Sequence, residues 1–239
     1  MLKERENGGA REAILEAIRQ NLAASEPFDA ARREHRAHQS SAKLTDAPLV
    51  SEKDLQAVPL IERFRENLIS IGGNCSVVKN EREAAQAIQA IIENSNARRI
   101  AVSDSPLVEK TIGFLKTGAS VFKNASAAEL FDCDLGITGA QWAIAETGTL
   151  VLESEREFNR LTSLVPPVHV CLVEAKNFRR TLGEILQKLN ENGRESLSRT
   201  ITFITGPSRT SDIELTLAIG VHGPRELRVV VIAGENYDG

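Results

Sequence analysis

RIAVSDSP (residues 99–106) joins an apolar strand to the start of a helix, and this junction sets the fold class. Arg99 to Ser103 is typical of a buried strand, because its apolar run is short and is followed by polar residues. Asp104-Ser105-Pro106 is suited to begin a helix, which the pattern continues through Leu115. A strand that runs directly into a helix is the building unit of a parallel α/β sheet.

The same alternation continues on both sides of this junction. Further strands are predicted over residues 75–78, 119–122, 134–138, 148–152, 168–173, 199–204 and 227–232. Further helices are predicted over residues 61–71, 84–92, 182–189 and 211–219. We therefore predict an open, mostly parallel Rossmann-like sheet with helices on both faces. In such sheets ligands sit beyond the carboxyl ends of strands, and Ser103 and Asp104 lie at one of these ends.

Composition limits the classes of protein that this chain can belong to. Its 239 residues are 41% hydrophobic and carry a net charge of −4, which argues against non-specific nucleic-acid binding. No apolar run is long enough to span a membrane, so a cytoplasmic protein is expected. Cys75, Cys133 and Cys171 lie far apart, which predicts buried thiols and no metal site or iron–sulfur cluster in this chain. We expect an N-terminal helical arm over residues 1–50 and an α/β domain over residues 51–239.

A first candidate site is the run Ala145-Glu146-Thr147-Gly148-Thr149, which directly precedes an apolar strand. Gly148 lets the backbone approach a ligand closely or adopt an unusual dihedral angle. Glu146 is a candidate base or nucleophile, because a carboxylate at a water-poor strand end can have a raised pKa. Thr147 and Thr149 add hydroxyl groups for ligand binding. The alternative is a turn in which Glu146 accepts hydrogen bonds from backbone amides.

A second candidate site is the run of residues 205–214, TGPSRTSDIE, between a predicted strand and the predicted helix. Free amides at a helix start, together with hydroxyls and a guanidinium, would bind a carboxylate or phosphate. The candidate ligand-binding residues are Gly206, Ser208, Arg209, Thr210 and Asp212. The alternative is an ordinary helix cap, although a cap does not require Arg209.

Two histidines, His169 and His222, are further candidates for a functional site beside these two motifs. His169 lies within an apolar strand, where a hydrogen-bonded core residue is more common than a catalyst. His222 lies in the Gly-rich loop of residues 220–226, where its ring is accessible enough to complete a pocket. The chain contains no GxGxxG, GxxxxGK[ST] or GxSxG motif, so standard dinucleotide, P-loop and serine-hydrolase sites are not supported.

Four ordered motifs resemble those of the LUD-domain family, and in particular its lactate-utilization protein C branch. They are Ala145-Glu146-Thr147-Gly148-Thr149, Pro166-Pro167-Val168-His169, the run of residues 206–214 and the run of residues 220–226. The resemblance implies a fold similar to that of the sugar-phosphate isomerase, glucosamine-phosphate deaminase and CoA-transferase group. It also implies a role in oxidising L-lactate to pyruvate with two partner proteins that carry the iron–sulfur clusters. A nucleophilic role for Glu146 would follow only from analogy with the CoA transferases of that group.

The sequence therefore favours a cytoplasmic subunit of a lactate-oxidising system that binds a small carboxylate or phosphate. An alternative is a stand-alone enzyme of the isomerase or transferase class, acting on a sugar phosphate or a CoA ester. A further alternative is a scaffold whose arm, residues 1–50, docks partner proteins.

Overall fold

The computed structural model describes residues 15–16, 60–157, 159–191, 198–211, 217–219 and 222–234. Leu15 and Glu16 are helical, as predicted for that part of the chain. The rest of the predicted arm lies outside the described residues, so the division at residue 50 stays a prediction. The fold described below lies within residues 60–234.

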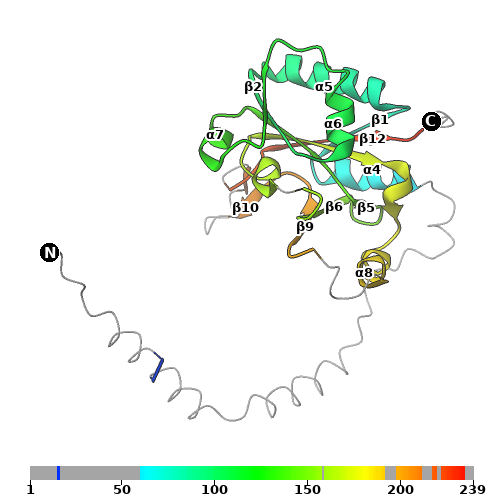
Figure 1. Ribbon diagram of the computed structural model, residues 1–239. Coiled ribbons are helices and arrows are strands. Elements are labelled where there is room, and N and C mark those ends of the chain that lie inside the picture. The colour runs from blue at the N-terminus through cyan, green and yellow to red at the C-terminus, as the bar shows by residue number, and fades with distance from the viewer. Residues whose placement is uncertain are drawn as a thin grey trace, which may run out of the picture. The chain divides into compact units, whose positions relative to one another are not determined.

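A six-stranded sheet forms the centre of the domain (Figure 1). Its strand order is β1 (Asn74–Val78), β12 (Glu226–Ile232), β7 (Val168–Glu174), β4 (Leu135–Gly139), β2 (Arg99–Val102) and β3 (Ser120–Lys123). Every neighbouring pair is parallel, which confirms the predicted parallel sheet. The central strands β4 and β7 are mostly apolar and are buried along almost their whole length, because both of their faces are covered.

Two helices cover one face of this sheet. They are α5 (Glu81–Ser95) and α6 (Pro106–Ile112). The α5 helix begins at Asn80, whose side chain accepts a hydrogen bond from the Glu83 amide at 3.0 Å, and ends at Asn96 in the left-handed conformation (φ 51°). Ile88 of α5 and Val108 of α6 are fully enclosed against the sheet. The short helix α7 (Ala127–Phe131) lies near the β2–β3 edge and begins with a capping box.

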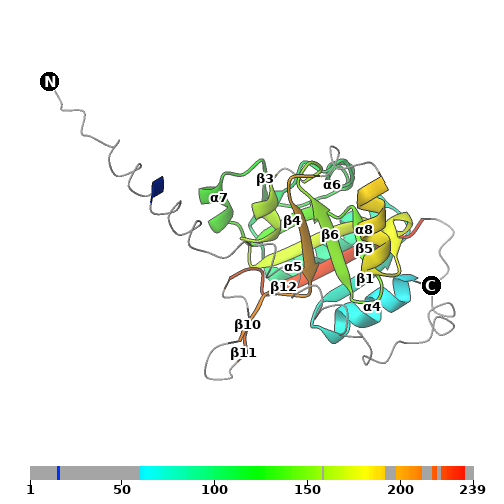
Figure 2. The same cartoon turned by 90° about the horizontal axis from the view of Figure 1, so that it is seen from below.

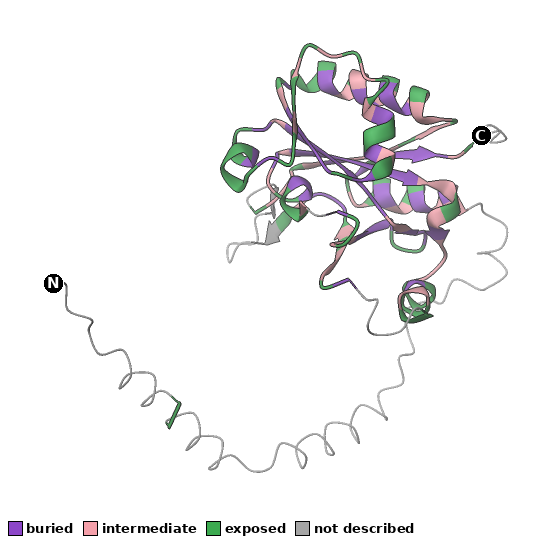
Figure 3. Ribbon diagram, viewed as in Figure 1, coloured by how far each residue is buried: buried purple, intermediate pink, exposed green. Residues whose placement is uncertain are grey.

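The opposite face carries the helix α4 (Leu60–Ser70) and a second, four-stranded sheet. The order of that sheet is β8 (Phe178–Arg179), β5 (Trp142–Ile144), β6 (Thr149–Glu153) and β9 (Ile201–Thr205). Phe64 of α4 meets Phe178 of β8 edge to face at 5.1 Å, and α4 packs with the small sheet against β7 and β12. Figure 2 looks onto this layer, with β6 in front of β12. Figure 3 shows that buried residues follow the strands and the inward sides of the helices.

The second sheet modifies the predicted architecture. The strands predicted at residues 148–152 and 199–204 exist, but β6 and β9 pair antiparallel with each other, outside the main sheet. The helix α8 (Leu182–Glu191) follows β8 and packs Ile185 against β5 and β6. Sequence patterning did not separate the two sheets because β6 is as apolar and as buried as the central parallel strands.

One predicted helix is wrong. Strands β10 (Arg209–Ser211) and β11 (Leu217–Ile219) occupy both ends of the region predicted as a helix, and they pair antiparallel. Residues 212–216 between them lie outside the described residues. Thr210 in β10 and Ile219 in β11 are β-branched, and such residues suit strands better than helices. The described residues near Ser208 therefore do not form the helix start on which the second candidate site depended.

The three cysteines of the chain are free thiols. Cys133 and Cys171 are buried, Cys75 is half-buried, and none of the three is in a disulfide. Burial raises the pKa of the Cys75 thiol to about 12.

Among the described helices, none has the length and hydropathy that would be needed to cross a lipid bilayer.

Candidate functional site at the carboxyl edge of the sheet

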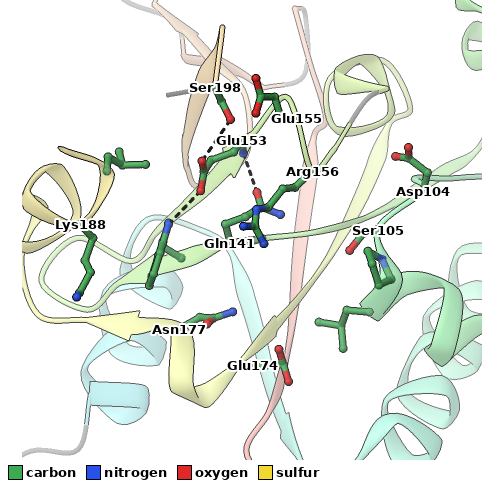
Figure 4. A pocket seen from close by; sticks show the side chains of 15 residues that line it. Asp104, Ser105, Gln141, Glu153, Glu155, Arg156, Glu174, Asn177, Lys188 and Ser198 are labelled. Carbon is green, nitrogen blue, oxygen red and sulfur yellow. Dashed lines mark hydrogen bonds between the residues drawn. The ribbon is translucent and has the colours of Figure 1, made fainter. Parts of the chain in front are cut away.

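A pocket of about 780 Å³ lies at the carboxyl ends of β2, β4 and β7. This is the edge at which parallel α/β sheets bind ligands. The residues that line it are Asp104, Ser105, Pro106, Leu107, Ala140, Gln141, Trp142, Glu153, Glu155, Arg156, Glu174, Asn177, Lys188, Leu189 and Ser198. Figure 4 shows Gln141 and Arg156 in the middle of this set, with Ser105 and Asp104 to one side and Lys188 to the other. We call this space the carboxyl-edge pocket.

One wall of the carboxyl-edge pocket is fixed by hydrogen bonds around Glu153 (Figure 4). The carboxylate of Glu153 accepts hydrogen bonds from Trp142 Nε1 at 3.2 Å and from Ser198 Oγ at 3.3 Å. The Glu153 amide donates to Gln141 Oε1 at 2.7 Å. These bonds join β5, β6 and Ser198, three residues before β9, so this wall is preorganised for ligand binding.

Some charged side chains of the pocket already form ion pairs, and others do not. Glu174 pairs with Lys176 at 2.8 Å, and Lys188 pairs with Glu191 at 2.7 Å. The guanidinium of Arg156 is exposed and forms no hydrogen bond or ion pair with any residue that the structure describes. Arg156 is therefore the cation of the pocket that is most available to a ligand carboxylate or phosphate.

Glu157 lies buried beside this pocket. Only 1% of the residue is exposed, and its Oε1 accepts a hydrogen bond from the Gly139 amide at 3.0 Å. A Cβ atom on Gly139 would lie 2.6 Å from Ser105 Oγ and 2.8 Å from Glu157 Oε1, so both side-chain oxygens lie closely against this glycine. Ser105 lines the pocket, as do Arg156 and Ala140, the chain neighbours of Glu157 and Gly139. The carboxyl group of Glu157 is thus enclosed just behind the pocket wall.

Burial raises the pKa of Glu157 to about 7. The nearby Ser103, Gly139 and Ser105 act in the opposite direction, and the charge of Asp104 adds to the increase. Ser103 Oγ is close enough to contribute, yet neither it nor Glu157 Oε2 has a hydrogen-bond partner at ordinary geometry. A buried carboxyl group that titrates near neutral pH at a ligand-binding edge is typical of a functional residue.

His169 belongs to the core. Its Nε2 forms a 2.8 Å hydrogen bond with Thr138 Oγ1, and the residue is 1% exposed. Burial lowers its pKa to about 3, so the ring is neutral at physiological pH. These contacts support the interpretation of His169 as a hydrogen-bonded core residue.

The first candidate motif lies at the turn between β5 and β6, where it packs against α4. Gly148 has φ +64°, and a Cβ atom there would lie 2.5 Å from the Leu68 amide nitrogen. Thr149 Oγ1 bonds to the hydroxyls of Thr147 and Thr205 at 2.7 and 2.8 Å. Glu146 is exposed, and its Oε1 accepts a hydrogen bond from the Leu182 amide at 2.9 Å, at the start of α8. Glu146 thus binds a backbone amide, as the alternative interpretation held, and its catalytic role stays a prediction.

The second candidate motif gathers at the C-terminal end of α4. Gly206 has φ +78° and lies against Ile71, and the Arg209 guanidinium donates a hydrogen bond to the Ile71 carbonyl oxygen. The Ser208 amide donates to the Pro224 carbonyl at 2.8 Å. His222 is exposed. The structure describes the backbone of Thr210 in β10, whereas Asp212 lies outside the described residues.

The ligand-binding residues predicted from the sequence therefore lie outside the carboxyl-edge pocket, as far as the structure describes them. Among the described residues, none of the predicted ligand-binding positions lines that pocket. Sequence reasoning placed Asp104 correctly at a strand end, but it did not single out Arg156 or Glu157. The only available signal was the charged run after β6, and charged runs on loops are usually solvent-exposed. Within the described part of the chain, no three His, Cys, Asp or Glu side chains come together as metal ligands.

Comparison with known proteins identifies the family. The model of the LUD domain matches residues 61–232, which span nearly all of the described fold. The chain belongs to the LUD-domain family. Within that family it lies in the lactate utilization protein C branch, which confirms the resemblance drawn from the sequence motifs.

Several relatives of this LUD-domain chain are similar over much of their length. An uncharacterized protein of Neisseria meningitidis is 37% identical over 71% of this chain and 65% of its own length. Lactate utilization protein C of Deinococcus radiodurans is 31% identical over 74% of this chain, and that of Halalkalibacterium halodurans is 29% identical over 75%; each match covers 82% of the relative.

A solved structure supports the fold of the LUD-domain chain. The crystal structure of a DUF162 family protein from Deinococcus radiodurans superimposes with a TM-score of 0.56 at 27% identity. The match covers 73% of this chain and 96% of that one.

Proposed function

We propose that this chain is a cytoplasmic subunit of an L-lactate oxidation system, which converts lactate to pyruvate with iron–sulfur partner proteins. The observation that carries the proposal is its place in the LUD-domain family beside relatives named lactate utilization protein C. The relatives' names support a role in lactate utilization, and the partner proteins and the ligand are part of the proposal.

Within this proposal, the carboxyl-edge pocket binds a small anion. Its support is the position of the pocket at the carboxyl ends of β2, β4 and β7 and the available guanidinium of Arg156. A charge-assisted pair of this kind contributes about 1.5–3 kcal/mol to binding. The predicted site around Arg209 is the competing location, and there the guanidinium already binds the Ile71 carbonyl.

Growth on L-lactate as the sole carbon source tests both parts of the proposal. A strain that lacks this gene should not grow, and the wild-type chain should restore growth. Arg156→Gln should raise the lactate concentration for half-maximal growth about tenfold or more, because it removes a charged donor. Arg98→Gln, an exposed arginine outside the pocket, is the matched control and should behave as wild type.

The possible outcomes distinguish a failure of the proposed role in lactate oxidation from a wrong location of the anion-binding site. Failure of the wild-type chain to restore growth contradicts the role in lactate oxidation. Normal growth with Arg156→Gln and no growth with a folded Arg209→Ala variant would move the anion site to Arg209. Thermal unfolding of each purified variant shows whether a growth defect reflects binding or folding.

A second candidate function is supported by Glu157. A buried carboxyl group with a pKa of about 7 beside a pocket of about 780 Å³ also suits a stand-alone isomerase or transferase that acts on a sugar phosphate or a CoA ester. The test is a panel of such substrates incubated with the purified chain alone. Turnover without partner proteins would favour this enzyme over the lactate-oxidising subunit.

A further inference from the structure

The two carboxyl oxygens of Glu157 differ in their hydrogen bonding. Its Oε1 is fixed by the Gly139 amide at 3.0 Å, whereas Oε2 is buried and has no hydrogen-bond partner. Ser103 Oγ, at the carboxyl end of β2, is also buried and unpartnered. These two groups lie near each other, because Ser103 lowers the pKa of the Glu157 carboxyl group, yet their geometry is not that of an ordinary hydrogen bond. A buried polar atom without a full hydrogen bond costs about 1–3 kcal/mol.

The surroundings of Glu157 connect it to the carboxyl-edge pocket. Ser105 Oγ and Glu157 Oε1 both lie against the same side of Gly139, and Ser105 also lines the pocket. The Ser105 side chain gives no helix-capping hydrogen bond to α6, so its hydroxyl is not committed to that role. Ser105 therefore lies beside both the pocket and the carboxyl group of Glu157.

We propose that Glu157 is the proton-exchanging residue of the carboxyl-edge pocket, contacting through its free Oε2 an oxygen atom of a small hydroxy acid or oxo acid. The ligand class rests on the proposed function, whereas the contact itself rests on the enclosure of Glu157 behind Ser105. In the transfer, the Oε2–H bond breaks and its electron pair stays on the carboxylate. The proton bonds to a lone pair of the ligand oxygen, and the reverse step restores the acid.

Groups from several elements face this carboxyl group. Asp104, before α6, and the burial of Glu157 favour the protonated form, whereas the polar groups of Ser103, Ser105 and Gly139 favour the carboxylate. On β7, the thiol of Cys171 lies near enough to feel the charge of Glu157, and burial and that charge both raise the pKa of the thiol. Cys171 therefore stays protonated, and Glu157 is the group of this cluster that exchanges protons near neutral pH.

The first test is chemical labelling of the full chain. Dicyclohexylcarbodiimide reacts with protonated carboxyl groups in apolar surroundings, and fragment mass spectrometry locates the modified residue. We expect Glu157 to be labelled several-fold more at pH 6 than at pH 8.5. Glu66, exposed on α4, is the internal control and should show little labelling at both pH values. A Glu157 that stays unlabelled at pH 6 is closed off from the pocket, and the proposal is then wrong.

The second test is lactate oxidation in extracts of the complemented strain, measured from pH 5.5 to 8.5. General acid–base groups contribute about 10²- to 10⁴-fold, so we expect Glu157→Gln to lower the rate at least 100-fold. Glu157→Asp should retain part of the rate with a shifted pH profile, and Glu66→Gln should match wild type. A folded Glu157→Gln variant with the wild-type rate and pH profile would overturn the proposal.

These two tests keep the inference separate from the proposed function. If the wild-type chain does not restore lactate oxidation, the lactate role fails, and the ligand class named here fails with it. Labelling of Glu157 in the purified chain still decides whether the carboxyl group exchanges protons with the pocket.

Discussion

Two buried titratable residues have opposite effects on how stability depends on pH. His169 has a folded pKa of about 3 against an ordinary value of 6.5, so the unfolded chain binds the extra proton between these values. Glu157 has a folded pKa of about 7 against an ordinary value of 4.5, so the folded chain binds the extra proton in that interval. Between pH 4.5 and 6.5 the two effects on the free energy of unfolding nearly cancel.

Single substitutions should separate these two effects. In Glu157→Gln only the histidine remains, so the free energy of unfolding should fall as the pH is lowered from 6.5 to 4.5. In His169→Gln only the glutamate remains, so the free energy of unfolding should rise as the pH is lowered from 7 to 4.5. Each change should be about 2–3 kcal/mol, since one pKa unit corresponds to about 1.4 kcal/mol. Urea unfolding at pH 4.8 and 6.5 measures it, and slopes of the same sign in both variants would contradict the assignment.

At the scale of elements, the turn between β5 and β6 determines how closely α4 can approach the small sheet. Gly148 has a positive φ, and its Cα faces the backbone of α4 at Leu68. Asn67 of α4 donates a hydrogen bond from its side chain to the Ala145 carbonyl at 2.7 Å in the same turn. The close approach of two backbones therefore requires a glycine here, independently of any ligand.

Gly148→Ala should destabilise the protein by about 2 kcal/mol or more. The substitution adds strain at a left-handed residue, and its Cβ meets backbone atoms that cannot move without shifting α4. Gly183→Ala is the matched control, since Gly183 is exposed in α8 and nothing lies within 3.4 Å of its added Cβ. The control should stabilise by up to about 1 kcal/mol, because alanine is the better helix former. Thermal unfolding compares the pair, and equal melting temperatures would refute the packing argument.

At the scale of the whole molecule, the buried members of the four apolar core clusters found among the described residues lie within residues 61–232. The LUD-domain match covers the same residues. This part of the chain thus has a hydrophobic core of its own, whose burial stabilises the fold.

A chain that begins at Gln56 should therefore fold by itself. We expect a single cooperative thermal transition and the circular dichroism of an α/β protein, both measured beside the full-length chain. Absence of a cooperative transition would show that residues 1–55 contribute to the core. If the shortened chain folds but fails to support growth on lactate, the interpretation of the arm as a docking element for partner proteins gains support.

The sequence by itself determined the parallel α/β class, most strands of the main sheet and the family. These features depend on local apolar periodicity, on helix start and stop residues and on ordered motifs, all of which are written in neighbouring residues. The tertiary structure alone decided that β6 and β9 form a second sheet, since strand pairing joins residues about 50 positions apart. It also decided that Arg209 binds the Ile71 carbonyl just after α4 and that Glu157 is buried beside a pocket. Burial and partner choice depend on which distant segments pack together, and no local pattern encodes them.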